Sequence, residues 1–283
     1  MAVDLHSHST ASDGSDSPDE LVRRAAEARI TSLALTDHDT LDGIPEARAA
    51  ARREGIELIP GTELSLEWAA GGMHLVVLWL EPGPGPLQDR LEELRSGRNG
   101  RNERIVERLR GMGIDVDIEE VLAEAGDGAV GRPHIAEVMR RKGYVPDIKT
   151  AFDRFLAKGA PAYVDRPRLD PEEGIRLARL SGAVPILAHP HTLGVERPQD
   201  MDEILERLVS AGLVGMECFY GTYDVEGRRG LVSRAVKHGL LPSGGSDYHG
   251  LYKPDVALGT GKVGLGVPLS VLDDLTAARA DVA

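Results

Sequence analysis

Nine residues suited to binding a metal ion lie beside short apolar runs of this sequence. Six are histidines and three are carboxylates, namely His6, His8, Asp13, His38, Glu63, His74, His189, Asp247 and His249. Imidazoles and carboxylates are common ligands of zinc, manganese and iron in proteins. The carboxyl ends of the strands of an α/β barrel meet at one face, so side chains at those ends converge. The pattern therefore predicts one metal-lined pocket, and with it an enzyme.

The pair His6 and His8 is especially informative because its members are two residues apart. They follow the apolar run 2–5, and alternate residues of a strand point to the same face. A shared ion explains this spacing better than two unrelated histidines do. Glu63 and Asp247 add carboxylates, which can bridge the closely spaced ions of a two-metal site.

The apolar runs that would position these residues alternate with amphipathic stretches typical of helices. The runs are 2–5, 31–36, 57–64, 74–80, 184–188, 214–219 and 240–244. A helix is expected to begin at Ser17-Pro18-Asp19-Glu20, because Ser17 can cap it, Pro18 suits its first turn and the two acids face its dipole. Similar patterns predict helices from about residue 42 and over 171–180, 200–211 and 224–239. This alternation indicates an α/β fold.

The middle of the chain interrupts this alternation. Residues 87–164 contain no convincing strand and four helical patterns, at 87–112, 117–125, 133–142 and 147–158. We therefore expect residues 1–90 and 165–283 to form the barrel that carries the metal centre. Residues 91–164 are expected to form an all-helical insertion, which would serve as a lid or a substrate-binding subdomain.

Composition excludes several classes of partner. The chain has 283 residues, which is enough for a barrel. Its net charge of −13 argues against extensive electrostatic binding to duplex DNA. A small anionic substrate remains possible, because divalent cations reverse the local charge. No run of 18 apolar residues and no secretory signal pattern is present, so no membrane association is expected. The single cysteine, Cys218, is expected to be a buried thiol and fits a reducing cytoplasm. The oligomeric state stays open.

Other polar residues near the predicted ligands are expected to have supporting roles. His191 follows His189 by two residues, and we expect it to lie beside the ligands or to face the substrate. His238 is expected at a helix C-terminus. Asp37 and Asp39 are expected to orient His38 or to cap the next helix.

Five segments of the sequence together resemble the PHP family, whose name comes from polymerase and histidinol phosphatase. They are residues 4–14 (Asp-Leu-His-Ser-His-Ser-Thr-Ala-Ser-Asp-Gly), 35–40, 61–63, 188–190 and 245–249. The resemblance spans residues 4 to about 249. It implies a distorted, TIM-like (β/α)₇ barrel with a trinuclear metal centre on the face where the strands end.

The resemblance also implies how the nine ligands are shared among three divalent ions. One ion would be held by His6, His8, Glu63 and Asp247. The second would be held by Glu63, His74 and His189, and the third by Asp13, His38 and His249. Asp13 stands where some members of the family carry a histidine. The change from nitrogen to oxygen favours Mn²⁺, with iron or Zn²⁺ as alternatives.

Within the family, the segment Gly-Arg-Pro-His at 131–134 resembles the branch that contains nucleoside 3′,5′-bisphosphate phosphatases and 5′-3′ exoribonucleases. This implies that a metal-activated hydroxide removes the 3′-phosphate of a nucleotide such as adenosine 3′,5′-bisphosphate. His38, His249 and Asp247 are the candidate catalytic residues, the two histidines for proton transfer. The alternatives are an exoribonuclease acting on short 5′-phosphorylated RNA, a histidinol-phosphatase-like phosphomonoesterase, and a non-catalytic metal-binding module.

Four residues of the helical region are candidates for binding the substrate's phosphate groups. Arg132 and His134 flank Pro133, which suits the first turn of a helix, where backbone amides attract an anion. Arg98 and Arg101 lie about one helical turn apart. The alternative is that these side chains are solvated charges on helix surfaces.

Overall fold

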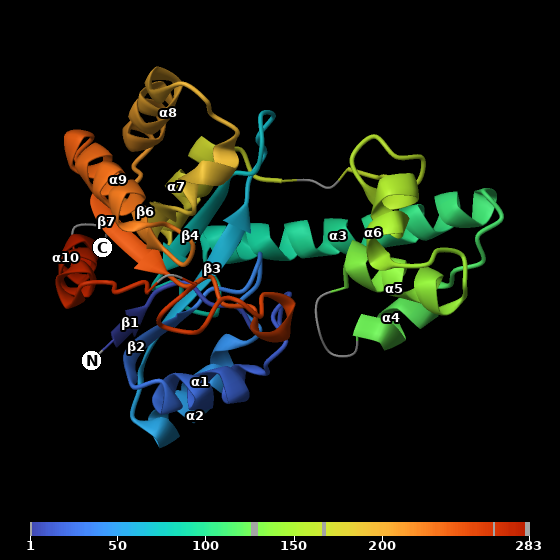
Figure 1. The fold of residues 1–283 in the computed structure, drawn as a ribbon, viewed down its shortest axis with the longest axis horizontal. Coiled ribbons are helices and arrows are strands. Elements are labelled where there is room, and N and C mark those ends of the chain that lie inside the picture. Colours follow the sequence, from blue (N-terminus) through green and yellow to red (C-terminus); the bar gives the residue numbers. More distant parts are fainter. Residues whose placement is uncertain (1, 126–129, 166–167, 263, 281–283) are drawn as a thin grey trace. The chain divides into compact units, whose positions relative to one another are not determined.

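The computed structural model describes residues 2–125, 130–165, 168–262 and 264–280, with side chains throughout except at 96–99. Contacts between residues divide the chain into two compact units. The first comprises Met1–Leu91 and Arg168–Ala283, and the second comprises Glu92–Pro167. Figure 1 labels most of the helices and strands of both units.

The first unit is built on a seven-stranded sheet whose strand order follows the sequence. The strands are β1 (Ala2–Asp4), β2 (Ile30–Leu35), β3 (Glu57–Ser65), β4 (His74–Leu78), β5 (Val184–Leu187), β6 (Gly215–Tyr220) and β7 (Leu241–Gly245). Each coincides with one of the seven apolar runs. The sheet curls until its first and last strands meet, since Leu5 N–H donates to the carbonyl oxygen of Gly244 over 3.3 Å. The prediction of a distorted α/β barrel is confirmed.

Strand β4 runs in the opposite direction to its neighbours. It pairs antiparallel with both β3 and β5, whereas the other neighbouring strands pair in parallel. The connection between β3 and β4, residues 66–73, is shorter than the dozen or so residues that a crossover between parallel strands needs. The reversal therefore places the beginning of β4, and not its end, beside the end of β3.

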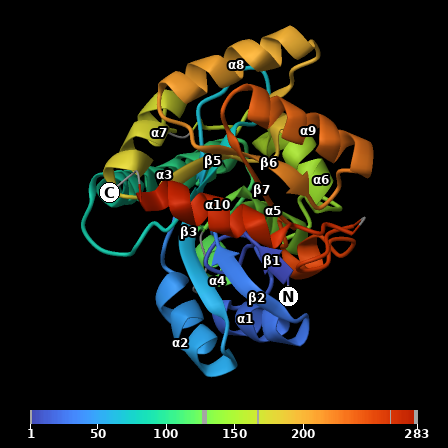
Figure 2. The same cartoon turned by 90° about the vertical axis from the view of Figure 1, so that its left-hand side faces the viewer.

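Six helices of the first unit surround the strands (Figure 2). They are α1 (Pro18–Glu27), α2 (Ile44–Glu54), α7 (Pro171–Leu180), α8 (Pro198–Ser210), α9 (Val225–Lys237) and α10 (Leu269–Ala280). Helix α1 begins as predicted, because the Ser17 side chain accepts a hydrogen bond from the backbone N–H of Glu20. Among the described residues, no helix has both the length and the apolar composition of a membrane span.

Helix α10 was not predicted from the sequence, because its charged and apolar residues do not separate into a clear stripe. Its Val271 and Leu275 pack against the apolar side chains that fill the barrel interior, among them Val3, Ile59 and Ile186. Figure 2 shows α10 crossing in front of the strands. The helix thus covers an apolar core that the strands alone would leave open to water.

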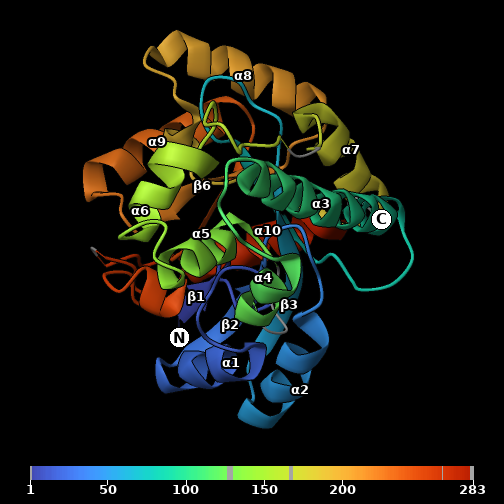
Figure 3. The ribbon, with the colours of Figure 1, turned by 90° about the vertical axis from the view of Figure 1, so that its right-hand side faces the viewer.

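The described residues of the second unit contain helices and no strand (Figure 3). Its elements are the greater part of α3 (Pro86–Gly111), then α4 (Ile118–Ala125), α5 (Arg132–Arg141) and α6 (Ile148–Ala151), which continues as the π-helix Phe152–Leu156. They coincide with the four helical patterns in the sequence. The second unit has its own hydrophobic core, as a small helical domain does. Its fully buried side chains include Ile105, Leu109, Ile135, Met139 and Leu156.

Candidate metal centre

The nine predicted ligands lie together at one rim of the barrel, close to the ends of its strands. His6 and His8 follow β1, His38 follows β2, Glu63 lies near the end of β3, His189 follows β5, and Asp247 and His249 follow β7. Asp13 lies in the loop between β1 and α1. Every strand except β6 thus has one or two of these polar side chains in it or next to it at the same rim, as the convergence of strand ends leads one to expect.

His74 is the one ligand that begins a strand, and the direction of β4 explains it. His74 is the first residue of β4 and pairs with Ser65, the last residue of β3. In an antiparallel pair, the start of one strand lies beside the end of the other. The reversed strand therefore brings His74 to the same rim as ligands that follow their strands.

A first group of residues able to hold a metal ion consists of His6, His8, Glu63 and Asp247, all of them buried. Nε2 of His6 and Nε2 of His8 each lie 3.1 Å from Oε2 of Glu63. Oδ1 of Asp247 lies 3.6 Å from Nε2 of His6 and 3.3 Å from Nε2 of His8. These four residues form the set that the family resemblance implied for one ion.

Glu63 faces further histidines with its second oxygen. Oε1 lies 2.7 Å from Nδ1 of His74 and 2.8 Å from Nε2 of His189. His38, Glu63 and His74 form a group whose ligand atoms all lie within 4.8 Å of one another. Glu63 thus stands between two clusters of imidazole nitrogens, the position of a carboxylate that bridges two ions.

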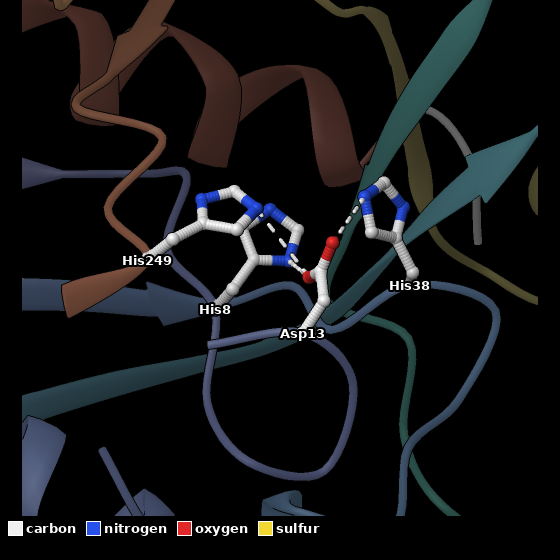
Figure 4. Close-up of side chains that lie close together, drawn as sticks. All are labelled: His8, Asp13, His38 and His249. Atoms are coloured by element: carbon white, nitrogen blue, oxygen red, sulfur yellow. Dashed lines mark ion pairs between the residues drawn. The ribbon is translucent and has the colours of Figure 1, made fainter. Parts of the chain in front are cut away.

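A third group surrounds Asp13, and Figure 4 shows its side chains. Nδ1 of His8 and Nε2 of His249 lie 3.5 and 3.4 Å from Oδ1 of Asp13, and Nε2 of His38 lies 3.7 Å from Oδ2. His8 therefore belongs to two groups, one at each ring nitrogen. The Asp13 side chain is 53% exposed, so this part of the centre is open to water.

Close packing of charges displaces the pKa values of these groups. Burial by itself lowers the pKa of His8, but Asp247 and Glu63 outweigh it and raise the pKa to about 10. Burial likewise opposes the protonation of His6, yet Glu217 and Glu63 hold its pKa well above the usual value. Burial raises the pKa of Glu63, but the surrounding histidines outweigh it and hold the pKa well below its usual range.

His38 behaves differently from its neighbours. Burial lowers its pKa to about 4, so its ring is neutral at pH 7. Its Nδ1 atom is buried and, among the described residues, has no hydrogen-bond partner, although Oε2 of Glu63 lies 3.4 Å away. A buried polar atom without a hydrogen bond is rare in folded proteins unless it serves another partner. An unpaired nitrogen among converging nitrogens and carboxylate oxygens fits a divalent cation.

Glu217 is a buried carboxylate behind the ligands that the sequence reasoning missed. Its Oε1 lies 2.8 Å from Nδ1 of His6, and its Oε2 accepts a hydrogen bond from the backbone N–H of His189 over 2.6 Å. It thereby directs Nε2 of His6 toward the first group, as carboxylates behind metal-binding histidines commonly do. Its signal in the sequence was an acid within the buried strand β6, where an unpaired charge would be costly.

Asp37 and Asp39 do not cap the next helix, which was one of their two expected roles. Asp37 accepts hydrogen bonds from the backbone N–H and hydroxyl of Ser9 and from the hydroxyl of Ser12. Asp39 accepts one from the backbone N–H of Ser65. Asp37 thus stabilises the loop after β1, and Asp39 stabilises the end of β3. Helix α2 begins after Gly43 and is capped by neither of them. Both therefore fix the backbone from which ligands project.

Backbone strain also marks the rim. His189 has a φ of 23° and Asp247 a φ of 57°, a region that residues other than glycine seldom occupy. Such strain tends to occur at functional sites, where the surrounding structure holds it in place. Next to Asp247, the close approach of β7 to β1 requires Gly245, because a Cβ there would lie 2.4 Å from the backbone nitrogen of His6.

Asp247 is held from outside by two further side chains. The Tyr220 hydroxyl donates to Oδ2 of Asp247 over 2.6 Å, and Nζ of Lys253 lies 2.6 Å from the same oxygen. Oδ1 of Asp247 therefore faces the histidines while Oδ2 is fixed. His238 caps the C-terminal end of α9 and bonds Asp202, as its expected structural role requires.

The four candidate substrate-binding residues belong to the second unit. Nη1 of Arg132 donates to the carbonyl oxygen of Leu156, and its guanidinium lies over the rings of Phe152 and Tyr163. Nδ1 of His134 accepts a hydrogen bond from the backbone N–H of Gly131, the N-cap residue at the start of α5. Arg101 is buried and bonds the side chain of Asn102. The side chain of Arg98 lies outside the described residues.

Comparison with known proteins gives a consistent result. A model of the PHP domain matches residues 4–93. The 3′,5′-nucleoside bisphosphate phosphatase of Chromobacterium violaceum is 34% identical over 260 residues, which cover 87% of both chains. The 5′-3′ exoribonuclease Rnm of Salmonella typhimurium is 36% identical over 255 residues, covering 88% of this chain and 85% of the relative.

A solved structure from Bifidobacterium adolescentis, described as a metal-dependent phosphoesterase, has the same fold. Its TM-score is 0.82 at 29% identity, and the match covers 98% of this chain and 96% of the other. The likeness thus extends over nearly the whole length of both chains, and the histidine and carboxylate groups at the barrel rim are able to hold metal ions. The chain belongs to the PHP family of metal-dependent phosphoesterases.

Proposed function

We propose that this protein is a metal-dependent phosphatase that hydrolyses the 3′-phosphate of nucleoside 3′,5′-bisphosphates. The observation that carries the proposal is the position of Glu63, whose two oxygens face separate clusters of histidine nitrogens at the barrel rim. A carboxylate so placed suits a centre of several ions, a common arrangement in enzymes that cleave phosphate esters. The choice of substrate rests on the likeness to the Chromobacterium enzyme over most of both chains.

The proposed cofactors are three divalent ions, with Mn²⁺ preferred and iron or Zn²⁺ as alternatives. His6, His8, Glu63 and Asp247 would hold one ion, Glu63, His74 and His189 a second, and Asp13, His38 and His249 a third. The nitrogen and oxygen donors at the rim support this choice, and they include no sulfur. When bound, such ions supply Lewis-acid activation of water and of the phosphoryl oxygens.

The protein itself would orient the substrate and move protons. The side chain of His38 is 20% exposed and lies beside Asp13 at the open side of the centre, where a proton could be exchanged with water. We assign proton transfer to His38 and His249. Asp247 is the third proposed catalytic residue, since Tyr220 and Lys253 fix its carboxylate beside the histidines.

The second unit is proposed to bind the remaining phosphate of the substrate. Arg98, Arg101, Arg132 and His134 are the candidate residues, and a guanidinium is well suited to a phosphate because it can donate two parallel hydrogen bonds. In this proposal the unit, approximated by residues 91–164, acts as a lid or substrate-binding subdomain.

A second candidate function is 5′-3′ exoribonuclease activity on short 5′-phosphorylated RNA. The likeness to the Salmonella enzyme, 36% identical over most of both chains, favours it. It would use the same centre on a longer substrate. A histidinol-phosphatase-like activity is the third alternative. In each case the partner is a small phosphorylated molecule or an RNA end, and the cytoplasmic location stays a prediction.

Phosphate release from adenosine 3′,5′-bisphosphate by the Mn²⁺-loaded protein tests the proposal. A 5′-phosphorylated RNA of a few nucleotides, histidinol phosphate and metal-free protein are assayed in parallel. We expect AMP to be the only nucleotide product and the metal-free protein to be inactive. Stepwise release of mononucleotides from the RNA, with no turnover of the bisphosphate, would assign the protein to the exoribonucleases instead.

A further inference from the structure

His191 lies at the rim of the metal centre and has no part in the ligand groups. It belongs to the short 3₁₀ helix Pro190–Leu193, two residues after His189. The centroids of the His189 and His191 rings are 6.0 Å apart, and Nε2 of His189 bonds Glu63. Unlike the buried ring of His189, the side chain of His191 is exposed, so it faces the medium from which a substrate arrives.

The hydroxyl group of Tyr223 sets the orientation of the His191 ring. The hydroxyl oxygen accepts a hydrogen bond from the backbone N–H of His191 over 3.4 Å and lies 2.7 Å from Nδ1 of the same residue. A hydroxyl has one hydrogen to donate and two lone pairs that can accept. Donation of that hydrogen to Nδ1 gives the hydroxyl both a donor and an acceptor role in this contact, and it places the ring proton on Nε2.

Two aromatic rings hold the imidazole in place. The Tyr223 ring stands nearly perpendicular to it, at 84° and a centroid distance of 5.3 Å, and the Tyr220 ring lies at the same distance on a tilted plane. Tyr220 also donates to Asp247, a predicted metal ligand. Within the described part of the chain, Nε2 of His191 has no hydrogen-bond partner. In the tautomer in which Nδ1 accepts from Tyr223, Nε2 is an oriented N–H donor at the edge of the centre.

We propose that His191 binds the substrate by donating its Nε2–H to a phosphoryl oxygen at the metal centre, and that Tyr223 is the positioning residue that fixes this tautomer. The inference deepens the proposed function and rests on it for the identity of the ligand as a phosphate ester. An anionic oxygen is the strongest acceptor available to such a donor. Because the ring is already oriented, the bond forms with little further loss of side-chain freedom.

Binding of inorganic phosphate to the Mn²⁺-loaded protein, followed by calorimetry, tests the proposal. We expect His191→Ala to weaken phosphate binding by about tenfold or more, the usual effect of losing a hydrogen bond to a charged group. Tyr223→Phe should weaken it by a smaller factor. In the double variant, Tyr223→Phe should add nothing to the loss caused by His191→Ala. His238→Gln is the control, because His238 caps a helix and bonds Asp202.

Metal content and the melting temperature of each variant separate this role from a structural one. If His191 and Tyr223 only brace the turn at 190–193, both variants will melt earlier while the metal-loaded protein binds phosphate as tightly as the wild type. That result would overturn the proposal. Since the probe is inorganic phosphate, the outcome does not depend on which nucleotide is hydrolysed, so failure of the proposed function is a separate result.

The tautomer itself is measurable by nitrogen-15 NMR of the histidine rings in the zinc-loaded protein, with His191→Gln identifying the signal. We expect the wild type to carry its proton on Nε2 and Tyr223→Phe to populate the other tautomer as well. A wild-type ring protonated only at Nδ1 would contradict the proposed donor even if the His191→Ala protein failed to bind metal.

Discussion

The candidate metal centre in the first unit and the arginine-containing helices of the second unit place their charged side chains in different ways. At the barrel rim, nitrogen and oxygen atoms from separate strands face one another, and Glu63 is shared between groups. In the second unit, the Arg132 guanidinium contacts a backbone carbonyl and two aromatic rings of its own unit. Convergence of side chains from distant segments is thus stronger evidence of a site than a motif along one helix.

The energetic cost of the two arrangements differs as well. The rim buries imidazoles and carboxylates whose pKa values are displaced in opposite directions, a state that metal ions would relieve. Arg132 instead gains stabilising contacts where it lies. Strongly perturbed groups are typical of functional sites, whereas well-paired cations also occur for stability alone.

The largest expected effect follows from removing the shared carboxylate. Glu63→Gln should lower kcat/KM by about a thousandfold or more, because it removes the negative charge that two ions would share. Steady-state turnover and metal content measured together test this prediction. Glu57→Gln, at an exposed glutamate on the same strand, is the matched control. Full activity with normal metal content in the Glu63 variant would mean that the rim is not the active site.

Removing the carboxylate behind the ligands should have a smaller effect. Glu217→Gln weakens the hydrogen bonds that Glu217 makes with the His6 ring and with the backbone N–H of His189. We therefore expect the affinity for metal to fall by about 10- to 100-fold. Titration of the metal-free protein with Mn²⁺ measures the change. An unaltered affinity would reduce Glu217 to a packing role.

Metal binding should depend on pH, because His8 must lose a proton to act as a ligand. Its pKa in the metal-free protein is about 10, above the ordinary value of 6.5, so it is protonated at pH 7. The stability that this charge contributes is fully present below about pH 6.5 and is lost as the pH rises through about 10.

We therefore expect the apparent metal affinity to rise between pH 6.5 and 8.5 by about tenfold per pH unit for each displaced proton. Calorimetry in buffers of different ionisation enthalpy should detect the released protons. Affinity that stays constant over this range would show that His8 is neutral before metal binds.

The smallest expected effect concerns Arg132. Replacing it with Met should destabilise the protein by about 1–2 kcal/mol, through loss of the ring contacts and the bond to Leu156. Arg140→Met, at an exposed ion pair on the same helix, is the control for stability. If Arg132 also binds phosphate, KM should rise for adenosine 3′,5′-bisphosphate and change little for 3′-AMP. An equal rise with both substrates would leave Arg132 with a structural role only.

Much of the fold, and the meeting of the predicted ligands at one rim, was predictable from local pattern. Strands and helices follow apolar spacing and capping residues such as Ser17, which act over a few residues. Helix α10 escaped prediction because only its contacts with the barrel interior reveal its buried face. Glu217 escaped because its neighbours in sequence are apolar, while its partners follow β1 and β5.

The sequence by itself determined the residue types, their positions next to the strands and, through the motifs, the family. Only the tertiary structure decided how the ligands group: that His8 faces two groups, that His38 lies beside Glu63 and His74, and that a reversed strand carries His74 to the rim. The physical reason is that local spacing specifies which way a side chain points from its strand. Strand direction, register and barrel closure then set which side chains meet.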